Sequence, residues 1–260
     1  MATAIRTIVV LVLAWLIVPL AGSLSAIKDI DAGTWIFLIL SGLATGASWL
    51  CYFKALKVGD INKVVPVDKS STVLTMLLAI IFLGEQVNAW VLAAMVGIGV
   101  GTLLMIERKT DVGEVSEKHG WSWLLYASGA AIFAALTAIL GKIGIEGVES
   151  TLGTAIRTCV VLVRAWLIVF IQRTHKQIFT VDKRSWLFLI LSGLTTGLSW
   201  LCYFRALQDG PASVVVPIDK LSILVSLAFG AIVFREKLSK KASLGLALIV
   251  VGTLALVVKQ

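Results

Sequence analysis

Nine apolar stretches run through this chain, and each is long enough to cross a lipid bilayer as a helix. They lie near residues 4–22, 35–53, 64–83, 89–106, 121–141, 153–171, 186–204, 214–234 and 242–258. A helix needs about 20 apolar residues to span the hydrocarbon core, whereas a strand of a membrane barrel needs only about 10. The stretches therefore predict an all-α polytopic membrane protein with nine spans.

The composition excludes the main classes of water-soluble protein. Hydrophobic residues make up 58% of the 260 residues and charged residues only 15%, against roughly 45–50% and about 25% in soluble domains. A chain of this kind cannot cover its apolar surface in water. Disorder is excluded too, because it needs low hydrophobicity and high charge. We therefore interpret the net charge of +8 as a topology signal and not as a sign of nucleic-acid binding.

An internal duplication organises the chain. Residues 2–109 align without a gap on residues 153–260 at a constant offset of 151, and 48 of the 108 pairs are identical. The strongest matches pair Ser41–Leu56 with Ser192–Leu207, and Pro66, Asp68 and Lys69 with Pro217, Asp219 and Lys220. We expect a first repeat at 1–110, a polar linker at 111–120 and a second repeat at 121–260.

The two repeats differ in their number of spans. Span 121–141 precedes the second repeat, but nothing precedes the first, which gives four spans in one repeat and five in the other. Two explanations stay open: the opening helix has been lost, or the sequence starts downstream of the true start.

The charges of the loops predict the orientation. Fourteen Lys and Arg residues lie in connections on the same side of the membrane as the N-terminus, and four lie in connections on the opposite side. Since Lys and Arg accumulate in cytoplasmic loops, the N-terminus is expected inside and the C-terminus outside. Loops poor in Lys and Arg align with loops rich in them, which places matching loops on opposite faces of the membrane. This predicts two inverted-topology repeats, an arrangement that transporters use to open alternately to either side.

These features resemble the EamA-type members of the drug/metabolite transporter superfamily. The resemblance rests on the repeats, on S-G-L-x-T-G-x-S-W-L-C-Y-F-[KR]-A-L, on V-V-P-[VI]-D-K-x-S, and on Glu85 and Glu236 after the following helix. It implies a ten-helix fold of two inverted halves, lacking its first helix here, and a bacterial inner-membrane carrier of small metabolites. The family usually keeps both termini in the cytoplasm, whereas loop charge here places the C-terminus outside.

Seven ionisable side chains lie within the predicted spans, and five of them are positive. They are Arg6, Asp68, Lys69, Arg157, Arg164, Asp219 and Lys220. A charge at the centre of a membrane helix costs roughly 2.5–3.5 kcal/mol, so it marks function by default. The positive excess predicts a cavity for anionic or zwitterionic metabolites.

Arg157 and Arg164 form the favoured anion-binding face. Seven residues separate them, about 10 Å along nearly the same side of a helix. The alternative for Arg164 is a structural ion pair with Asp68 or Asp219. Because Arg6 and Arg157 lie within about two turns of their helix starts, their alternative role is snorkelling to the lipid headgroups.

In each repeat an aspartate and a lysine follow a proline by two and three residues, as Asp68 and Lys69 follow Pro66. This position puts each Asp-Lys pair at the start of a predicted helix. Neighbours on a helix point about 100° apart, so each aspartate should find a partner other than the adjacent lysine. In one reading Lys69 and Lys220 bind substrate while Asp68 or Asp219 couples transport to an ion. In the other reading the lysines snorkel and the aspartates cap their helices.

Aromatic and small residues also recur in matching helices. Rings for an organic ligand are offered by Trp49, Tyr52, Trp200 and Tyr203. Close helix packing is predicted by Gly42 and Gly46, Gly193 and Gly197, and Gly97, Gly99 and Gly101. No nucleophile–base pair, metal cluster or phosphate loop is visible, so we expect neither enzymatic activity nor a metal or cofactor.

The favoured function is secondary transport of a small anionic or zwitterionic metabolite, such as an amino acid, by alternating access at the interface of the repeats. Two alternatives stay open. One is export of lipophilic cations, with Asp68 and Asp219 as acceptors, and the other is a non-transporting membrane subunit. The expected partners are the substrate, the lipid bilayer, and a second copy or a partner helix in place of the missing span; nucleic acid is not expected.

Overall fold

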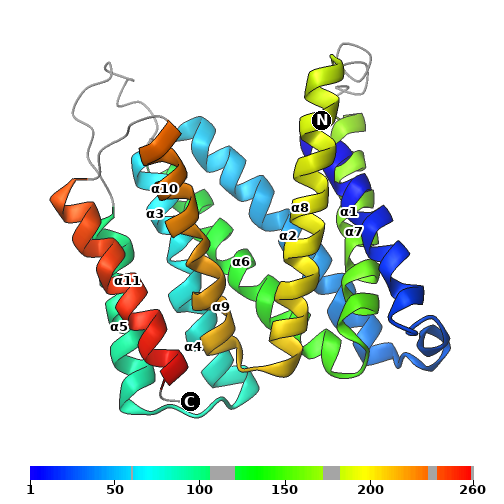
Figure 1. Ribbon diagram of the computed structural model, residues 1–260, viewed down its shortest axis with the longest axis horizontal. Coiled ribbons are helices and arrows are strands. Elements are labelled where there is room, and N and C mark those ends of the chain that lie inside the picture. The colour runs from blue at the N-terminus through cyan, green and yellow to red at the C-terminus, as the bar shows by residue number, and fades with distance from the viewer. Residues whose placement is uncertain (60, 106–120, 172–181, 234–238, 259–260) are drawn as a thin grey trace. The chain divides into compact units, whose positions relative to one another are not determined.

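The protein is described from a computed structural model that covers residues 1–59, 61–105, 121–171, 182–233 and 239–258. All regular secondary structure in these ranges is helical. The elements are α1 (Ala2–Leu20), η1 (Ser25–Asp29), α2 (Ala32–Val58), α3 (Ile61–Lys69), α4 (Ser71–Leu83), α5 (Ala89–Leu104), α6 (Ser122–Glu146), α7 (Ser150–Ile171), α8 (Lys183–Asp209), α9 (Ala212–Lys220), α10 (Ser222–Val233) and α11 (Lys240–Val258), as Figure 1 shows. The predicted linker at 111–120 and Glu236 lie outside the described residues.

Seven of the described segments are long and apolar enough to cross a membrane. They are α1, α2, α6, α7, α8, α11 and the stretch Ala212–Phe229, whereas α5 is apolar but shorter. Each predicted span overlaps one helix or two consecutive helices. Large apolar side chains are widely exposed, among them Leu20 at 86% and Ile232 at 79%. Lipid covers such a surface and water does not, so the chain is a multi-pass membrane protein.

The chain forms two compact units, and each of them combines segments from both sequence repeats. The first unit consists of Met1–Gly46 and Leu140–Asp209, and the second of Ala47–Ile139 and Gly210–Gln260. The division between the units falls inside α2 and inside α6.

The same helix packing occurs twice in the first unit. There α1, α7 and α8 lie side by side (Figure 1). A Cβ added to Gly42 would lie 3.1 Å from the carbonyl oxygen of Arg157, and one added to Gly193 would lie 3.0 Å from that of Arg6. Both the glycines and the arginines are related by the offset of 151. The glycines therefore serve close helix packing, as the sequence predicts.

Matching residues also build the pairing of α5 with α11 in the second unit, where the two helices run side by side (Figure 1). A Cβ added to Gly101 would lie 2.6 Å from the carbonyl oxygen of Gly245 and 2.9 Å from the side chain of Ile249. At the equivalent position, a Cβ on Gly252 would lie 3.2 Å from the side chain of Ile98. The interface thus uses the same positions of each repeat.

Gly101→Ala is expected to destabilise the protein by about 1–3 kcal/mol, the usual cost of overpacking a core. The added methyl group meets the backbone of Gly245, which cannot rotate away as a side chain could. The close packing predicted at Gly97 is wrong, since the nearest atom to a Cβ there is 3.9 Å away, and Gly97→Ala is therefore the matched control on the same helix. Thermal unfolding in detergent compares the two variants, and equal midpoints would contradict the close packing at Gly101.

Two segments of the second unit are interrupted at matching positions. In the described chain α3 gives way to α4 at Ser70, and α9 gives way to α10 at Leu221. At each point the amide donates to the carbonyl three residues earlier, at 3.2 Å for Ser70 and 3.0 Å for Leu221. This is the tighter turn of a 3₁₀-helix. Each of the predicted spans 64–83 and 214–234 therefore consists of two consecutive helices joined by one tighter turn.

Two predictions about these segments are wrong. The sequence places Pro217 at the start of a helix, but α9 begins at Ala212 and Pro217 lies inside it. Asp219 is consequently near the C-terminal end of α9 and does not cap its start. The Nζ of Lys220 also lies 3.4 Å from Oδ2 of Asp219, although neighbours were expected to find other partners. Because α9 ends at Lys220, the long side chain can fold back onto its neighbour.

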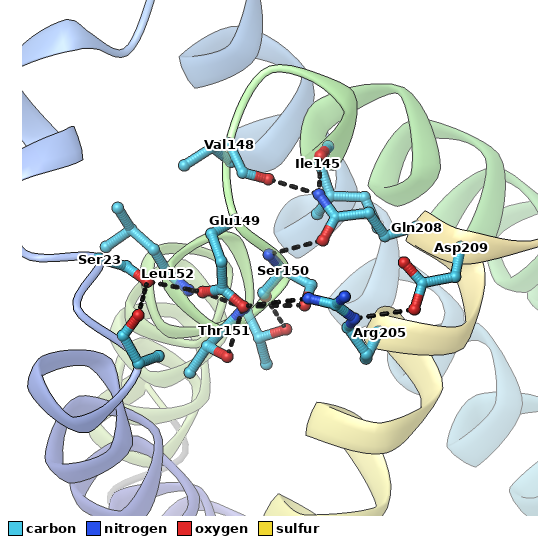
Figure 2. A network of polar contacts seen from close by, with 12 residues as sticks. Ser23, Ile145, Val148, Glu149, Ser150, Thr151, Leu152, Arg205, Gln208 and Asp209 are labelled. Atoms are coloured by element: carbon cyan, nitrogen blue, oxygen red, sulfur yellow. Dashed lines mark hydrogen bonds and ion pairs between the residues drawn. The ribbon is translucent and has the colours of Figure 1, made fainter.

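A polar network joins the ends of three helices of the first unit (Figure 2). The carboxylate of Glu149 accepts the amides of Thr151 at 2.9 Å and Leu152 at 3.2 Å, which caps the start of α7. It also accepts the hydroxyl of Ser23 at 3.0 Å. Partial burial pushes the pKa of Glu149 up, but the hydrogen bonds outweigh burial and hold that pKa below its ordinary value.

Gln208 completes this network from the end of α8 (Figure 2). Its amide nitrogen donates to the carbonyls of Ile145 at 2.6 Å and Val148 at 2.8 Å, near the end of α6. Its amide oxygen accepts the backbone N–H of Ser150 at 3.1 Å, at the start of α7. Helix ends leave backbone groups without partners, and Gln208 satisfies three of them at once. The network therefore fixes the joint between α6, α7 and α8.

Candidate functional site

A cavity of about 400 Å³ lies beside the two helix interruptions of the second unit. Its polar lining consists of Lys69, Thr72, Thr102, Lys220 and Ser222, and its apolar lining of Val65, Ile98, Met105, Ile223 and Ile249. Lys69 and Lys220 are related by the offset of 151, and so are Ile98 and Ile249. The volume falls in the range of small-molecule sites, roughly 300–1,000 Å³.

Lys69 and Lys220 supply the charge of this cavity. Both lysines line it, whereas their neighbours Asp68 and Asp219 are not among its lining residues. Lys220 and Asp219 are paired at 3.4 Å, with side chains 37% and 36% exposed. An ammonium group donates three hydrogen bonds, so one aspartate leaves donors of Lys220 for a ligand. The cavity can therefore hold a carboxylate or a phosphate against its lysines and an apolar group against its isoleucines.

Arg157 lies in a closed cage of the first unit and is only 2% exposed. Its Nη1 donates to the hydroxyls of Ser41 at 3.3 Å and Thr45 at 3.0 Å. Its guanidinium carbon lies 4.0 Å from the ring centroid of Phe204 and 5.1 Å from that of Trp200. The hydroxyl groups and the ring faces compensate part of the buried charge. Arg157 therefore does not snorkel, which corrects that alternative.

The guanidinium of Arg157 is incompletely satisfied. Its Nε has no hydrogen-bond partner within the described part of the chain. A buried polar group without a partner costs free energy and calls for an explanation.

The other two arginines also contact neighbouring helices of the first unit. Arg6 donates from Nη1 to the hydroxyl of Ser192 at 3.4 Å, which repeats the contact of Arg157 with Ser41 in the other repeat. Arg164 donates from Nη1 to the carbonyl of Leu43 at 3.3 Å, and its guanidinium lies against Gly46. Arg157 and Arg164 thus share one face of α7, and that face packs on α2. Anion binding by this face stays a prediction.

The four aromatic candidates occupy different surroundings. Trp200 lies against Arg157, and Tyr203 packs edge-on against Phe204 with ring centroids 5.1 Å apart. Tyr52 packs against a buried cluster that contains Ala55, Val64 and Ala127. Trp49 is half-buried in the second unit. None of the four is in the lining of the 400 Å³ cavity, so their contact with substrate also stays a prediction.

Sequence reasoning missed the hydroxyl groups of the cavity. Thr72 follows Lys69 by three residues, a spacing that puts both on one face of a helix, and this was the available signal. Within the described ranges, no group of three or more His, Cys, Asp or Glu side chains lies close enough together to hold a metal ion.

The sequence matches the EamA-like transporter family over residues 1–107 and 121–258. The chain belongs to this family. An uncharacterized transporter of Sinorhizobium sp is 45% identical over 137 residues, which cover 53% of this chain and 97% of that protein. An uncharacterized protein of Methanocaldococcus jannaschii is 27% identical over 90 residues, or 35% of this chain and 66% of that protein.

A crystal structure of another protein supports the fold of this EamA family member. The two superpose with a TM-score of 0.77 over 100% of this chain and 88% of that chain, at 15% sequence identity. At a sequence identity this low, the similarity shows a shared fold and does not show a shared function. The family and the relative described as a transporter make the chain a membrane transporter, which favours transport over a non-transporting subunit or an enzyme.

Proposed function

We propose that this EamA family member is a secondary transporter of a small anionic or zwitterionic metabolite, such as an amino acid, and works by alternating access. One observation carries the proposal: Lys69 and Lys220, from matching positions of the two repeats, line one cavity beside the two helix interruptions. Interrupted helices in matching positions of two halves are where transporters of this kind bind their substrates.

In the proposed mechanism the two ammonium groups bind the carboxylate or phosphate of the substrate. Charged hydrogen bonds of this type are short and about twice as strong as neutral ones. The hydroxyl groups of Thr72 and Thr102 add polar contacts, and the isoleucines accept the apolar part of the substrate. Asp68 or Asp219 couples transport to an ion, because an ionised aspartate competes with the substrate for its neighbouring lysine.

The proposed location is the inner (plasma) membrane, with the N-terminus in the cytoplasm and the C-terminus outside. Loop charge places the connection after span 64–83 and the connection before span 214–234 on the external face. In the second unit these two connections meet, because Glu85 of the first accepts a hydrogen bond from Ala212 at the end of the second. The contact supports the predicted order of crossings.

Uptake into proteoliposomes tests the proposed substrate class. The panel contains labelled amino acids, carboxylic acids, phosphate esters and one lipophilic dye cation, with empty liposomes as the control. We expect saturable uptake of at least one carboxylate or phosphate compound and competition by others of its class. Saturable uptake of the dye cation alone would contradict the proposal and favour the cation-export alternative.

A further inference from the structure

Glu85 holds the first turn of α9, although 127 residues separate it from that helix. Gly84 ends α4 in the left-handed conformation, with φ of 63°, which turns the chain toward α9. The carboxylate of Glu85 then accepts the amide of Ala212 at 2.6 Å and that of Ser213 at 2.9 Å. A residue of the first repeat thus clamps a helix of the second.

The start of α9 has no cap of its own. The first N–H groups of any helix lack partners within the helix. Pro211 occupies the capping position and makes no side-chain hydrogen bond there. Glu85 satisfies two of these amides and places a negative charge at the positive end of the helix dipole. The carboxylate therefore replaces the missing cap.

The opposite end of α9 belongs to the cavity. The helix has nine residues and ends at Lys220, so the clamped turn lies about 12 Å from the cavity lysine. Near the clamp, α9 is anchored by Val214, which packs in a buried cluster with Met76 and Leu256. Glu85 and Lys220 thus lie at opposite ends of one short helix, with Pro217 between them.

Space beside the clamp would let it open. A second cavity of about 220 Å³ is lined by Glu85, Gln86, Asn88 and Trp90 and by the start of α9. Glu85 is the one titratable side chain among its described lining residues. This volume can hold several waters, which could replace the two backbone donors when the carboxylate leaves them. Water in this cavity can therefore solvate the carboxylate when the clamp is released.

We propose that Glu85 is a positioning residue of the transport cycle, whose clamp on α9 sets the position of Lys220 and is released when the cavity changes its opening. The idea rests on the proposed function, since it assigns Lys220 to the substrate cavity. The matching Glu236 lies outside the described residues and has no part in the proposal.

Hydrogen exchange tests the clamp itself. Glu85→Gln keeps the shape of the side chain and removes its charge, and Glu85→Ala removes both carboxylate oxygens. We expect the amides of Ala212 and Ser213 to exchange at least about tenfold faster in Glu85→Ala, as for the loss of a charged hydrogen bond, and less so in Glu85→Gln. Gln86→Ala is the matched control in the same loop. Unchanged exchange in Glu85→Ala would overturn the proposal.

A cysteine reporter tests whether the clamp acts on the cavity. Ile223 lines the cavity just beyond α9, and Ile223→Cys is made in a chain whose three native cysteines are replaced by alanine. We expect Glu85→Ala and Glu85→Gln to change the alkylation rate of this cysteine at least about fivefold, and Gln86→Ala to leave it unchanged. Faster exchange without altered alkylation would show a local cap only and overturn the proposal. Neither readout uses a substrate, so this failure is distinct from failure of the proposed function.

Discussion

Lys69→Met/Lys220→Met is expected to raise the half-saturating concentration of the transported carboxylate at least about hundredfold. A hydrogen bond to a charged group contributes about 1.5–3 kcal/mol, and each 1.4 kcal/mol corresponds to about a factor of ten. Each single variant should therefore lose about tenfold or more. The two effects will not simply add, because both side chains line one cavity. Concentration-dependent uptake into proteoliposomes measures the change.

Two controls separate substrate binding from structural damage. Lys57→Met changes an exposed lysine of the second unit that does not line the cavity, and uptake should be unchanged. Asp219→Asn/Lys220→Met removes both partners of the ion pair at 3.4 Å, so that no unpaired aspartate is left behind. This variant should fold as well as the wild type and still bind poorly. An unchanged half-saturating concentration in the double lysine variant would exclude the cavity as the substrate site.

Arg157→Met is expected to keep the fold and to lose transport at least about tenfold. Replacing a buried charged group by an apolar one of similar volume is often neutral or stabilising. Met has comparable length and flexibility, and the hydroxyl of Thr45 retains a hydrogen bond to the carbonyl of Ser41 at 2.9 Å. Arg157→Ala leaves a void between three helices and should cost about 2–5 kcal/mol. Thermal unfolding and uptake are measured on the same preparations.

The pair of variants distinguishes the two roles of Arg157. Loss of transport in both, with loss of stability only in Arg157→Ala, shows that the positive charge is needed for function. Full transport by Arg157→Met would reduce Arg157 to a packing residue. Arg6→Met is the matched control, because the equivalent arginine is only half-buried and donates a hydrogen bond of 3.4 Å to Ser192. Its effects on stability and uptake should be smaller.

Much of the fold could be predicted because the membrane limits the options. Spans of 20 apolar residues can only be helices, and a gapless duplication makes each contact of one repeat a prediction for the other. The contacts of Gly42 with Arg157 and of Gly193 with Arg6 are one such pair. The spacing of seven residues also predicted that Arg157 and Arg164 share one helix face. Both arginines contact α2.

Other features depend on tertiary structure and could not be predicted from the sequence. The helix interruptions occur at Ser70 and Leu221, which are not helix-breaking residues, and the prolines that signal them lie four residues earlier. The contacts of Ser41 and Thr45 with the guanidinium of Arg157 could not be predicted. The sequence of one span does not tell which other helix packs against it. The cap formed by Glu149 could have been noticed, since a polar run just before an apolar stretch is typical of a helix start.

Transport by alternating access requires the cavity at Lys69 and Lys220 to open in turn to the two sides of the membrane. Thr72 lines this cavity and is buried, so Thr72→Cys in a chain without other cysteines reports on its access. We expect a membrane-impermeant thiol reagent to label this cysteine from the outside of intact cells and also from the cytoplasmic side in inverted vesicles. Labelling from one side only, or from neither, would contradict alternating access at this cavity.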